Sequence, residues 1–301
     1  MRPPALAIFD IGKTNKKIIV FDEQYNLLHE ESCELPEALD EDGDACEDVH
    51  ALSAWVKATL AVWLKQEKIE LKGVNVSAYG ASFVHLDEQC QLASPLYNYL
   101  KPYPKTLEEN FYQAYGGVTK ITRETASPAL GSLNSGLQLY RLKRESPEIY
   151  SRIKYSLHLP QYISYLLTGK LFSEITSLGC HTLLWDFEKK NYHEWVGKEG
   201  IEKKFPRLMK SNAGITVDYD EKKIVAGSGL HDSSAALIPY LASFSEPFVL
   251  ISTGTWCISL NPFNDSPLTD EELKQDCLCY LSYQGTPVKA SRIFAGNDHE
   301  V

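Results

Sequence analysis

The sequence predicts a soluble α/β protein, and three observations carry that prediction. The chain has 301 residues, of which 44% are hydrophobic and 23% are charged, so it can bury a sizeable core. Apolar runs of strand length alternate with longer segments in which apolar residues recur at helical spacing. Two strand-turn-strand units with Gly and Thr in the turn, one opening each half of the chain, indicate a duplicated architecture that faces one cleft.

The first strand-turn-strand unit opens the chain. An unbroken apolar run predicts a buried strand over residues 5–9, and a turn follows over 10–15. The returning strand is expected over 18–21, with a second turn over 22–26. Residues 36–48 are acidic and contain glycine, which predicts a solvated connecting loop, with a cation site as the weaker alternative.

A helix and two strands follow the acidic loop. The helix is expected over residues 48–68, and short apolar runs predict strands over 74–78 and 83–86. The helical interpretation rests on apolar side chains at helical spacing: Leu52, Val56, Leu60 and Trp63. These four side chains are expected to pack in the core.

The middle of the chain is expected to be mainly helical over residues 134–168, and Gly169 is a plausible C-terminal cap. A hairpin is expected over 215–226, followed by a helix over 233–241. The strand predicted over 248–252 opens a new unit. A boundary near residue 244 therefore divides the chain into two predicted domains, 1–244 and 245–301.

Charge and hydropathy exclude several classes of protein. The chain has 30 Lys and Arg against 40 Asp and Glu, a net charge of -10, so non-specific binding to nucleic acid or to anionic membranes is disfavoured. No apolar run approaches the ~20 residues that cross a bilayer. The N-terminus has no secretory pattern, and seven scattered cysteines indicate reduced thiols. A cytoplasmic protein is therefore expected.

The turn of the first unit has the composition of an anion site. A strand-turn-strand with glycine at its tip can present backbone N–H groups to phosphate, and Gly12 would allow that close approach. The side chains that add donors or positive charge are Lys13, Thr14, Asn15 and Lys17. Asp10 would repel a phosphate directly, but it fits if a hydrated magnesium ion lies between them. An ordinary Asp-Gly β-turn with surface lysines remains the alternative.

A second candidate lies before the helix predicted at 233–241. In the segment Gly229-Leu-His-Asp232, the carboxylate of Asp232 is either a helix cap or a general base that takes a proton from an attacking hydroxyl. His231 either positions a substrate or is a structural histidine. In the second strand-turn-strand unit, Thr253, Gly254 and Thr255 suit the leaving diphosphate.

Taken together and in this order, these segments resemble the FGGY carbohydrate kinases of the actin/hexokinase/Hsp70-like superfamily. The matching motifs are Asp10-x-Gly-x-Thr14, Gly229-Leu-His-Asp232 and Ser252-Thr-Gly-Thr-Trp256. The similarity extends over nearly the whole chain and is strongest to the rhamnulokinase and fuculokinase branch. That branch is indicated by Tyr79-Gly-Ala-Ser-Phe83, Gln138-Leu-Tyr140, Leu159-Pro-x-Tyr162, Tyr165-Leu-Leu-Thr-Gly169 and Glu174-x-Thr176.

The resemblance implies a ribonuclease-H-like N-terminal lobe, in which helices flank a mixed sheet, and the first strands of a related second lobe. It also implies transfer of the γ-phosphate of ATP, with Mg²⁺, to a hydroxyl of a ketose such as rhamnulose, fuculose or xylulose. Asp232 matches the catalytic base and Asp10 the magnesium-linked aspartate. Gly12, Thr14 and Lys17 match the phosphate hairpin, and Thr253, Gly254 and Thr255 match the leaving-phosphate element.

The sequence departs from the family pattern at several positions. Lys13 stands where the family has a small residue, and Ser82 and Gln161 stand where aspartates often lie near the sugar. A hydroxyl or an amide cannot make the same charge-assisted hydrogen bond, so the sugar stays open. The expected sugar contacts are Tyr79, Ser82, Gln161 and His231.

The chain is also shorter than the resemblance implies. It ends soon after the second lobe begins, so weak or no turnover is expected from the isolated 301 residues. A homodimer is possible. The alternative function is a catalytically silent sugar-binding or regulatory module on the same fold, against which the retention of both Asp10 and Asp232 argues.

Overall fold

The computed structural model describes residues 2–219, 222–253 and 257–293, and it divides into two compact units. The first unit comprises Met1–Asn98, Arg152–Ser177 and Phe205–Asp232. The second comprises Tyr99–Ser151, Leu178–Lys204 and Ser233–Val301. The predicted boundary near residue 244 stays a prediction.

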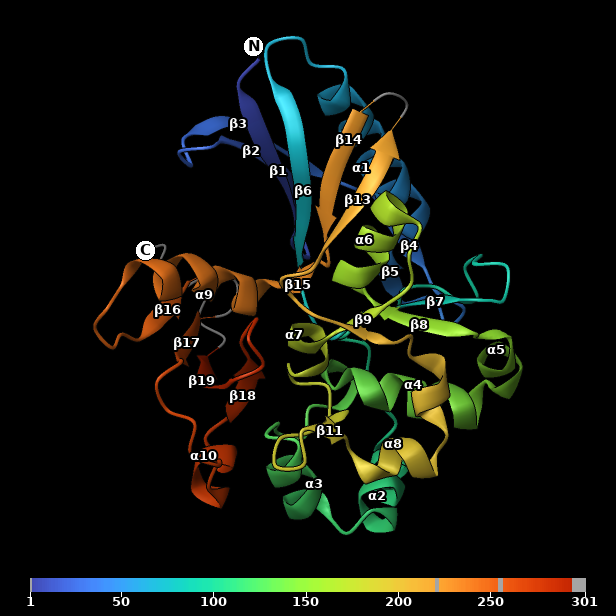
Figure 1. The fold of residues 1–301 in the computed structure, drawn as a ribbon. Coiled ribbons are helices and arrows are strands. Elements are labelled where there is room, and N and C mark those ends of the chain that lie inside the picture. Colours follow the sequence, from blue (N-terminus) through green and yellow to red (C-terminus); the bar gives the residue numbers. More distant parts are fainter. Residues whose placement is uncertain (1, 220–221, 254–256, 294–301) are drawn as a thin grey trace, which may run out of the picture. The chain divides into compact units, whose positions relative to one another are not determined.

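A mixed sheet forms the centre of the first unit (Figure 1). Its strand order is β13-β14-β6-β1-β2-β3, and β15 also pairs with β6. The strands β1, β2 and β3 are antiparallel neighbours, whereas β6 runs parallel to β1, β14 and β15. The strands are β1 Pro4–Ile11, β2 Asn15–Asp22, β3 Leu27–Glu34, β6 Glu70–Ala78, β13 Gly214–Tyr219, β14 Lys222–Gly227 and β15 Leu230–His231. The mixed sheet of the predicted α/β fold is thus confirmed.

Two helices pack on β6 and on each other, α1 (Val49–Leu64) and α6 (Leu159–Thr168) (Figure 1). The α1 helix begins where the Asp48 side chain accepts a hydrogen bond from the amide of Ala51, 2.9 Å away, which satisfies one of the free N–H groups of the first turn. The α6 helix ends at Gly169, whose φ of 66° is left-handed, so the expected C-terminal cap is confirmed. Three of the four predicted core residues of α1 are buried: Leu52, Val56 and Leu60.

Small paired strands complete the first unit. They are β4 Glu37–Leu39 with β5 Ala45–Glu47, β7 Phe83–Leu86 with β8 Tyr155–His158, and β9 Ser173–Glu174 with β12 Leu208–Met209. One expectation needs correction here, because the acidic stretch predicted as a loop over 36–48 contains the β4–β5 hairpin. The segment 134–168 is mainly helical, as predicted, but it also contains β8. The β8 strand forms because it has an antiparallel partner in β7, which lies far away in the sequence.

The second unit combines short helices with a four-stranded sheet of order β16-β17-β19-β18. Its strands are β16 Leu250–Ser252, β17 Cys257–Asn261, β18 Cys277–Leu281 and β19 Pro287–Ile293, with a small pair of β10 Trp185–Asp186 and β11 Asn191–Tyr192. Three of its helical segments, α5, α7 and α9, begin or end in the first unit. The helical segments are α2 Lys105–Ala114, α3 Val118–Glu124, η1 Gly131–Leu133, α4 Ser135–Glu145, α5 Pro147–Arg152, α7 Ile175–Leu178, α8 Glu194–Lys198, η2 Ile201–Lys204, α9 Asp232–Ser243 and α10 Asp270–Lys274.

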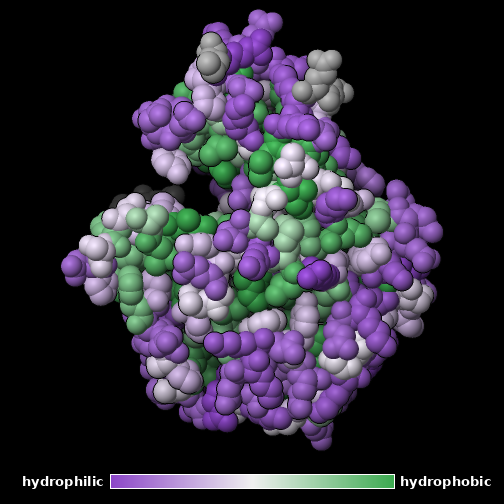
Figure 2. All heavy atoms as spheres, in the orientation of Figure 1, coloured by the Kyte–Doolittle hydropathy of each residue, from purple (hydrophilic) through white to green (hydrophobic). Residues whose placement is uncertain are grey.

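Aromatic and aliphatic side chains form the core of the second unit. Phe111 makes edge-to-face contacts with Tyr140 and Trp195, with ring centroids 5.1 and 5.0 Å apart. A second cluster includes Leu237 of α9 and Tyr280 of β18. Figure 2 shows apolar side chains gathered over α9 and β16. Exposed large side chains in or next to these two elements in the sequence are Tyr240, Phe244, Val249 and Ile251. Within the described parts of the chain, no helix is both long and apolar enough to cross a membrane.

Candidate functional site

The parallel strands of the first unit end together and bring two predicted carboxylates close to each other. Asp10 of β1 lies opposite Ser77 of β6, and His231 of β15 lies opposite the next residue of β6, Ala78. Asp232 follows His231 directly, and its negative charge raises the pKa of Asp10. Asp10 and Asp232 therefore lie near each other at the carboxyl edge of the sheet.

Asp10 lies in an environment that opposes its negative charge. Burial raises the pKa of Asp10, and the charge of Asp232 raises it further. A hydrogen bond from Ser77 and the positive charge of Lys17 act in the opposite direction but do not cancel the shift. Two neighbouring carboxylates of this kind are stabilised by a cation between them. Their oxygen atoms are the ligands that Mg²⁺ prefers, so the residues present fit the expected ion.

The turn between β1 and β2 is tight at Gly12. The Gly12 amide donates a hydrogen bond to the carbonyl of Asn15, 2.9 Å away, so this N–H is used within the turn. A Cβ atom at Gly12 would lie only 2.9 Å from that same carbonyl oxygen, which explains the need for glycine. Thr14 and Asn15 are exposed at the tip. The turn thus presents two of the predicted phosphate contacts to solvent.

The predicted lysines of this turn hold ion pairs. Lys13 Nζ lies 3.1 Å from Glu37 Oε1, and Lys17 Nζ lies 3.2 Å from Glu30 Oε1. These pairs are partly or largely exposed, and exposed pairs of this kind are weak, ~0–1 kcal/mol, so a phosphate could displace them.

Sequence reasoning missed a buried ion pair beneath the turn. Lys16 is 2% exposed, and its Nζ lies 2.8 Å from Glu47 Oε1 and 3.0 Å from the carbonyl of Lys13. The other Glu47 oxygen accepts a hydrogen bond from the Tyr79 hydroxyl at 3.0 Å. Strand alternation could have indicated this, because Lys16 shares the buried face of β2 with Ile18. The predicted sugar contact Tyr79 is thereby linked to the phosphate turn.

The predicted base lies at the start of α9. The Asp232 side chain is 42% exposed, and its Oδ1 lies 3.3 Å from Nε2 of His231, whose side chain is 3% exposed. Burial lowers the pKa of His231, so its imidazole is neutral at physiological pH. A neutral imidazole with its proton on Nε2 can donate to Oδ1 of Asp232 and so orient this carboxylate.

Two further predicted residues carry buried polar atoms that have no hydrogen-bond partner among the described residues. Gln161 and Ser82 are each 1% exposed. The Gln161 amide nitrogen donates to the carbonyls of Ser228 and Gly229, at 3.3 and 2.9 Å. Within the described parts of the chain, Gln161 Oε1 and Ser82 Oγ have no hydrogen-bond partner. Leaving such a group unpaired costs ~1–3 kcal/mol, so a bound ligand or an ordered water would stabilise both atoms.

Three buried histidines lie beside this region. His158 stacks on Phe83 with ring centroids 4.1 Å apart, and the Phe83 ring also contacts His85 at 5.6 Å. Burial lowers the pKa of His158 to about 3, and the neighbouring His231 and His85 lower it too. His158 is therefore held neutral inside the first unit.

This neutral histidine predicts a loss of stability in acid. Its folded pKa of about 3 lies below the ordinary value of 6.5, so only the unfolded chain takes up the proton as pH falls from about 6.5 toward 3. Between pH 7 and pH 5, we expect the unfolding free energy of the wild type to fall by about 2 kcal/mol more than that of His158→Gln. Urea unfolding at both pH values measures this, with exposed His50→Gln as the control. An equal loss in wild type and His158→Gln would contradict the prediction.

A second cluster of possible metal ligands lies in the second unit and is better explained as an ion pair. Glu124, Asp186 and His193 place their ligand atoms within 4.8 Å of one another. However, His193 Nδ1 accepts a hydrogen bond from the Trp195 amide at 3.3 Å, so the proton lies on Nε2, which is 2.7 Å from Glu124 Oε2. Lys189 Nζ lies 3.0 Å from Asp186. The cluster offers no free imidazole lone pair to a metal.

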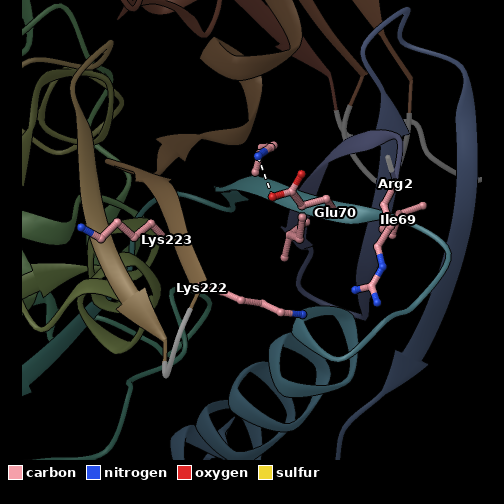
Figure 3. Close-up of a pocket in the computed structure, with 7 residues that line it drawn as sticks. Arg2, Ile69, Glu70, Lys222 and Lys223 are labelled. Carbon is pink, nitrogen blue, oxygen red and sulfur yellow. Dashed lines mark ion pairs between the residues drawn. The ribbon is translucent and has the colours of Figure 1, made fainter.

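Figure 3 shows a further pocket, which lies where β6 begins. Glu70, the first residue of β6, lies in it and pairs with Lys72 at 2.7 Å. The residues that line this pocket are Arg2, Ile69, Glu70, Leu71, Lys72, Lys222 and Lys223. Because Asp10 and Asp232 lie at the carboxyl end of the parallel strands, this pocket is not part of the candidate site.

The expected leaving-phosphate element lies in the second unit. Thr253 is exposed and directly follows β16, while Gly254 and Thr255 lie outside the described residues. Its relation to the first unit therefore stays a prediction.

The fold is that of the sugar kinases. A carbohydrate kinase from Novosphingobium aromaticivorans superimposes with a TM-score of 0.86 at 25% identity, covering 100% of this chain and 65% of that protein. The ligand-bound xylulose kinase from Lactobacillus acidophilus has a TM-score of 0.79 at 17% identity, over 98% of this chain and 61% of its own. The model of the FGGY family of carbohydrate kinases, N-terminal domain, matches residues 5–238. The chain belongs to the FGGY family.

Curated relatives agree with this assignment and with the predicted branch. The rhamnulokinase of Halalkalibacterium halodurans is 26% identical over 260 residues, which covers 82% of this chain and 52% of that protein. The rhamnulokinase of Yersinia pestis (strain Pestoides F) is 24% identical over 287 residues, which covers 89% of this chain and 56% of that protein. The chain thus spans about half the length of the curated relatives it matches.

Proposed function

We propose that this chain forms the sugar-binding and catalytic part of an ATP-dependent kinase that phosphorylates a hydroxyl of a ketose such as rhamnulose, fuculose or xylulose. The observation that carries the proposal is the pair Asp10 and Asp232 at the carboxyl edge of one sheet, close enough for one charge to perturb the other. Phosphoryl transfer needs positioning and charge stabilisation, and a carboxylate pair supplies both a base and a cation ligand.

The half-exposed carboxylate of Asp232 takes the proton of the attacking sugar hydroxyl, while His231 holds its other oxygen. Asp10 would hold Mg²⁺, which supplies charge neutralisation on the phosphates of ATP. The transferring phosphate is steadied by the β1–β2 turn through Lys13, Thr14, Asn15 and Lys17, with Gly12 shaping the turn. Thr253, Gly254 and Thr255 would contact the leaving diphosphate.

The sugar is bound by neutral polar groups in this proposal. Gln161 Oε1 and Ser82 Oγ are buried acceptors without partners in the described chain, and hydroxyl groups of a sugar would satisfy them. Tyr79 and His231 complete the expected contact set. A site built to bond hydroxyl groups rejects analogues that lack them, because its buried polar atoms then stay unpaired.

The test uses the protein expressed from its complete reading frame. ADP release is measured with rhamnulose, fuculose and xylulose, and binding of each ketose is measured by calorimetry. We expect one ketose to stimulate ADP release well above the sugar-free rate. Ketose binding without any stimulated ADP release would instead identify a silent sugar-binding module, and neither binding nor turnover would overturn the proposal.

Ser82→Ala separates a sugar contact from a structural role. The hydroxyl has no partner among the described residues, so its removal should leave the melting temperature unchanged or slightly raised. If it binds sugar, the KM for the ketose should rise about 5- to 20-fold, the worth of one hydrogen bond. The matched control is Ser156→Ala, because the equally buried Ser156 Oγ lies 2.9 Å from His85 Nδ1. The control should lose stability and keep its KM, and the same pattern in Ser82→Ala would contradict the assignment.

A further inference from the structure

We propose that the buried carboxylate of Glu174 is a positioning residue, which fixes the backbone of His231, and with it Asp232, through the hydroxyl of Thr176. This inference rests on the proposed function for Asp232. Neither Glu174 nor Thr176 is exposed, so neither can touch a substrate from its present place. They would act only through the strand that carries the base.

Glu174 lies at the end of β9 and is completely buried. Its Oε2 accepts hydrogen bonds from the Thr176 hydroxyl at 2.5 Å, the Thr176 amide at 2.9 Å and the Ser177 amide at 3.2 Å. Its Oε1 accepts a hydrogen bond from the Ser211 hydroxyl. All four donors are neutral, so the carboxylate is held by hydrogen bonds instead of a cation. A buried carboxylate is costly, and four donors make its position unusually well determined.

The Thr176 hydroxyl connects the Glu174 carboxylate to the segment that carries the proposed base, Asp232. It gives its only proton to Glu174 and accepts a hydrogen bond from the His231 amide, with 3.0 Å between the atoms. His231 is the last residue of β15, and α9 begins at Asp232. The direction of the Asp232 side chain therefore depends on a backbone that Thr176 holds in place.

The same carboxylate is also connected to the expected sugar contact. Ser211 donates to Glu174, and the Ser211 carbonyl accepts from the Ser228 hydroxyl at 3.0 Å. The Ser228 carbonyl in turn accepts from Gln161 Nε2 at 3.3 Å. One buried chain of hydrogen bonds thus runs from Gln161 through Glu174 to His231. It holds the proposed sugar contact and the proposed base in one rigid frame.

The test compares hydrogen exchange and kinetics in four variants of the complete protein. Thr176→Val keeps the side-chain shape but leaves the His231 amide unpaired. Amide exchange at His231 should rise at least 10-fold more than at Ala7 of the central strand β1. The kcat should fall at least 10-fold with the KM for ketose changed less than 3-fold, because positioning is lost rather than binding. Thr176→Ser should behave as wild type.

Glu174→Gln is expected to be mild, because the amide nitrogen can donate to Ser211 while the oxygen keeps the other three donors. The matched control is Thr125→Val, since Thr125 is 1% exposed and its hydroxyl donates only to the local carbonyl of Ile121, 2.7 Å away. The control should change neither His231 exchange nor kcat.

Equal exchange changes at His231 and Ala7 in Thr176→Val would overturn the inference, because the role would then be general stability. Faster His231 exchange with unchanged kcat would also overturn it. If the wild type shows no ketose-dependent turnover, the proposed function fails instead. The exchange comparison still decides whether Thr176 anchors the His231 amide, so the two failures are told apart.

Discussion

Asp232→Asn is expected to lower kcat for ketose phosphorylation by about 10²- to 10⁴-fold, the contribution of a positioned general base. The amide has nearly the same shape but cannot accept the proton of the attacking hydroxyl. The KM for ketose should change little, because the hydrogen bonds of Gln161 and Ser82 do not depend on the charge at position 232. Steady-state ADP release with the preferred ketose measures both constants.

A second readout of the same variant does not require turnover. The charge of Asp232 is one cause of the raised pKa of Asp10, so its removal should lower the pKa of Asp10. Carboxyl ¹³C chemical shifts followed against pH measure this. The control is Asp218→Asn, whose side chain is 68% exposed on β13, and it should alter neither quantity. If Asp232→Asn kept the wild-type kcat, Asp232 would not be the base. If the pKa of Asp10 did not change in this variant, the two carboxylates would not be close neighbours.

The local features of the fold could be predicted because they depend on neighbours in the sequence. The apolar run before Asp10 forms β1, and the left-handed cap at Gly169 ends α6. Type and spacing of residues were enough for these two features. The closeness of Asp10 and Asp232 follows from the sheet topology, since both residues come at the carboxyl ends of strands that run parallel to β6.

Other features depend on partners that are distant along the chain. Lys16 reads as one more exposed lysine until Glu47, 31 residues away, is found within 2.8 Å of it. Glu174 enters the sequence analysis only through the Glu174-x-Thr176 motif, which does not show that Ser211 and Thr176 enclose its carboxylate. Strand alternation can indicate that Lys16 is buried, but the partner of a buried charged group is set by tertiary contacts, which a local pattern of hydropathy does not identify. The contacts that position the site therefore escaped sequence analysis, whereas the candidate reacting groups did not.

Gly229→Ala is expected to destabilise the first unit by about 2–4 kcal/mol, through both backbone strain and overlap. Gly229 has a φ of +71°, and an added Cβ would lie 2.4 Å from the carbonyl oxygen of Pro160. Relief would require Gly229 to move away from α6, which breaks its hydrogen bond from Gln161 and its own to Asn75 Oδ1. Urea unfolding measures the loss.

Gly169→Ala measures the backbone strain alone, so the difference between the two variants gives the steric part of the effect. Gly169 has nearly the same φ, +66°, but nothing lies within 4 Å of an added Cβ, so only the strain of about 1 kcal/mol should appear. Because Gly229 lies three residues before Asp232, Gly229→Ala should also weaken ketose binding, whereas Gly169→Ala should not. Equal unfolding free energies in the two variants would show that the close approach to Pro160 does not constrain the segment leading to the base. A difference of about 1–3 kcal/mol would show that this contact helps to fix the proposed base relative to the proposed sugar contact on α6.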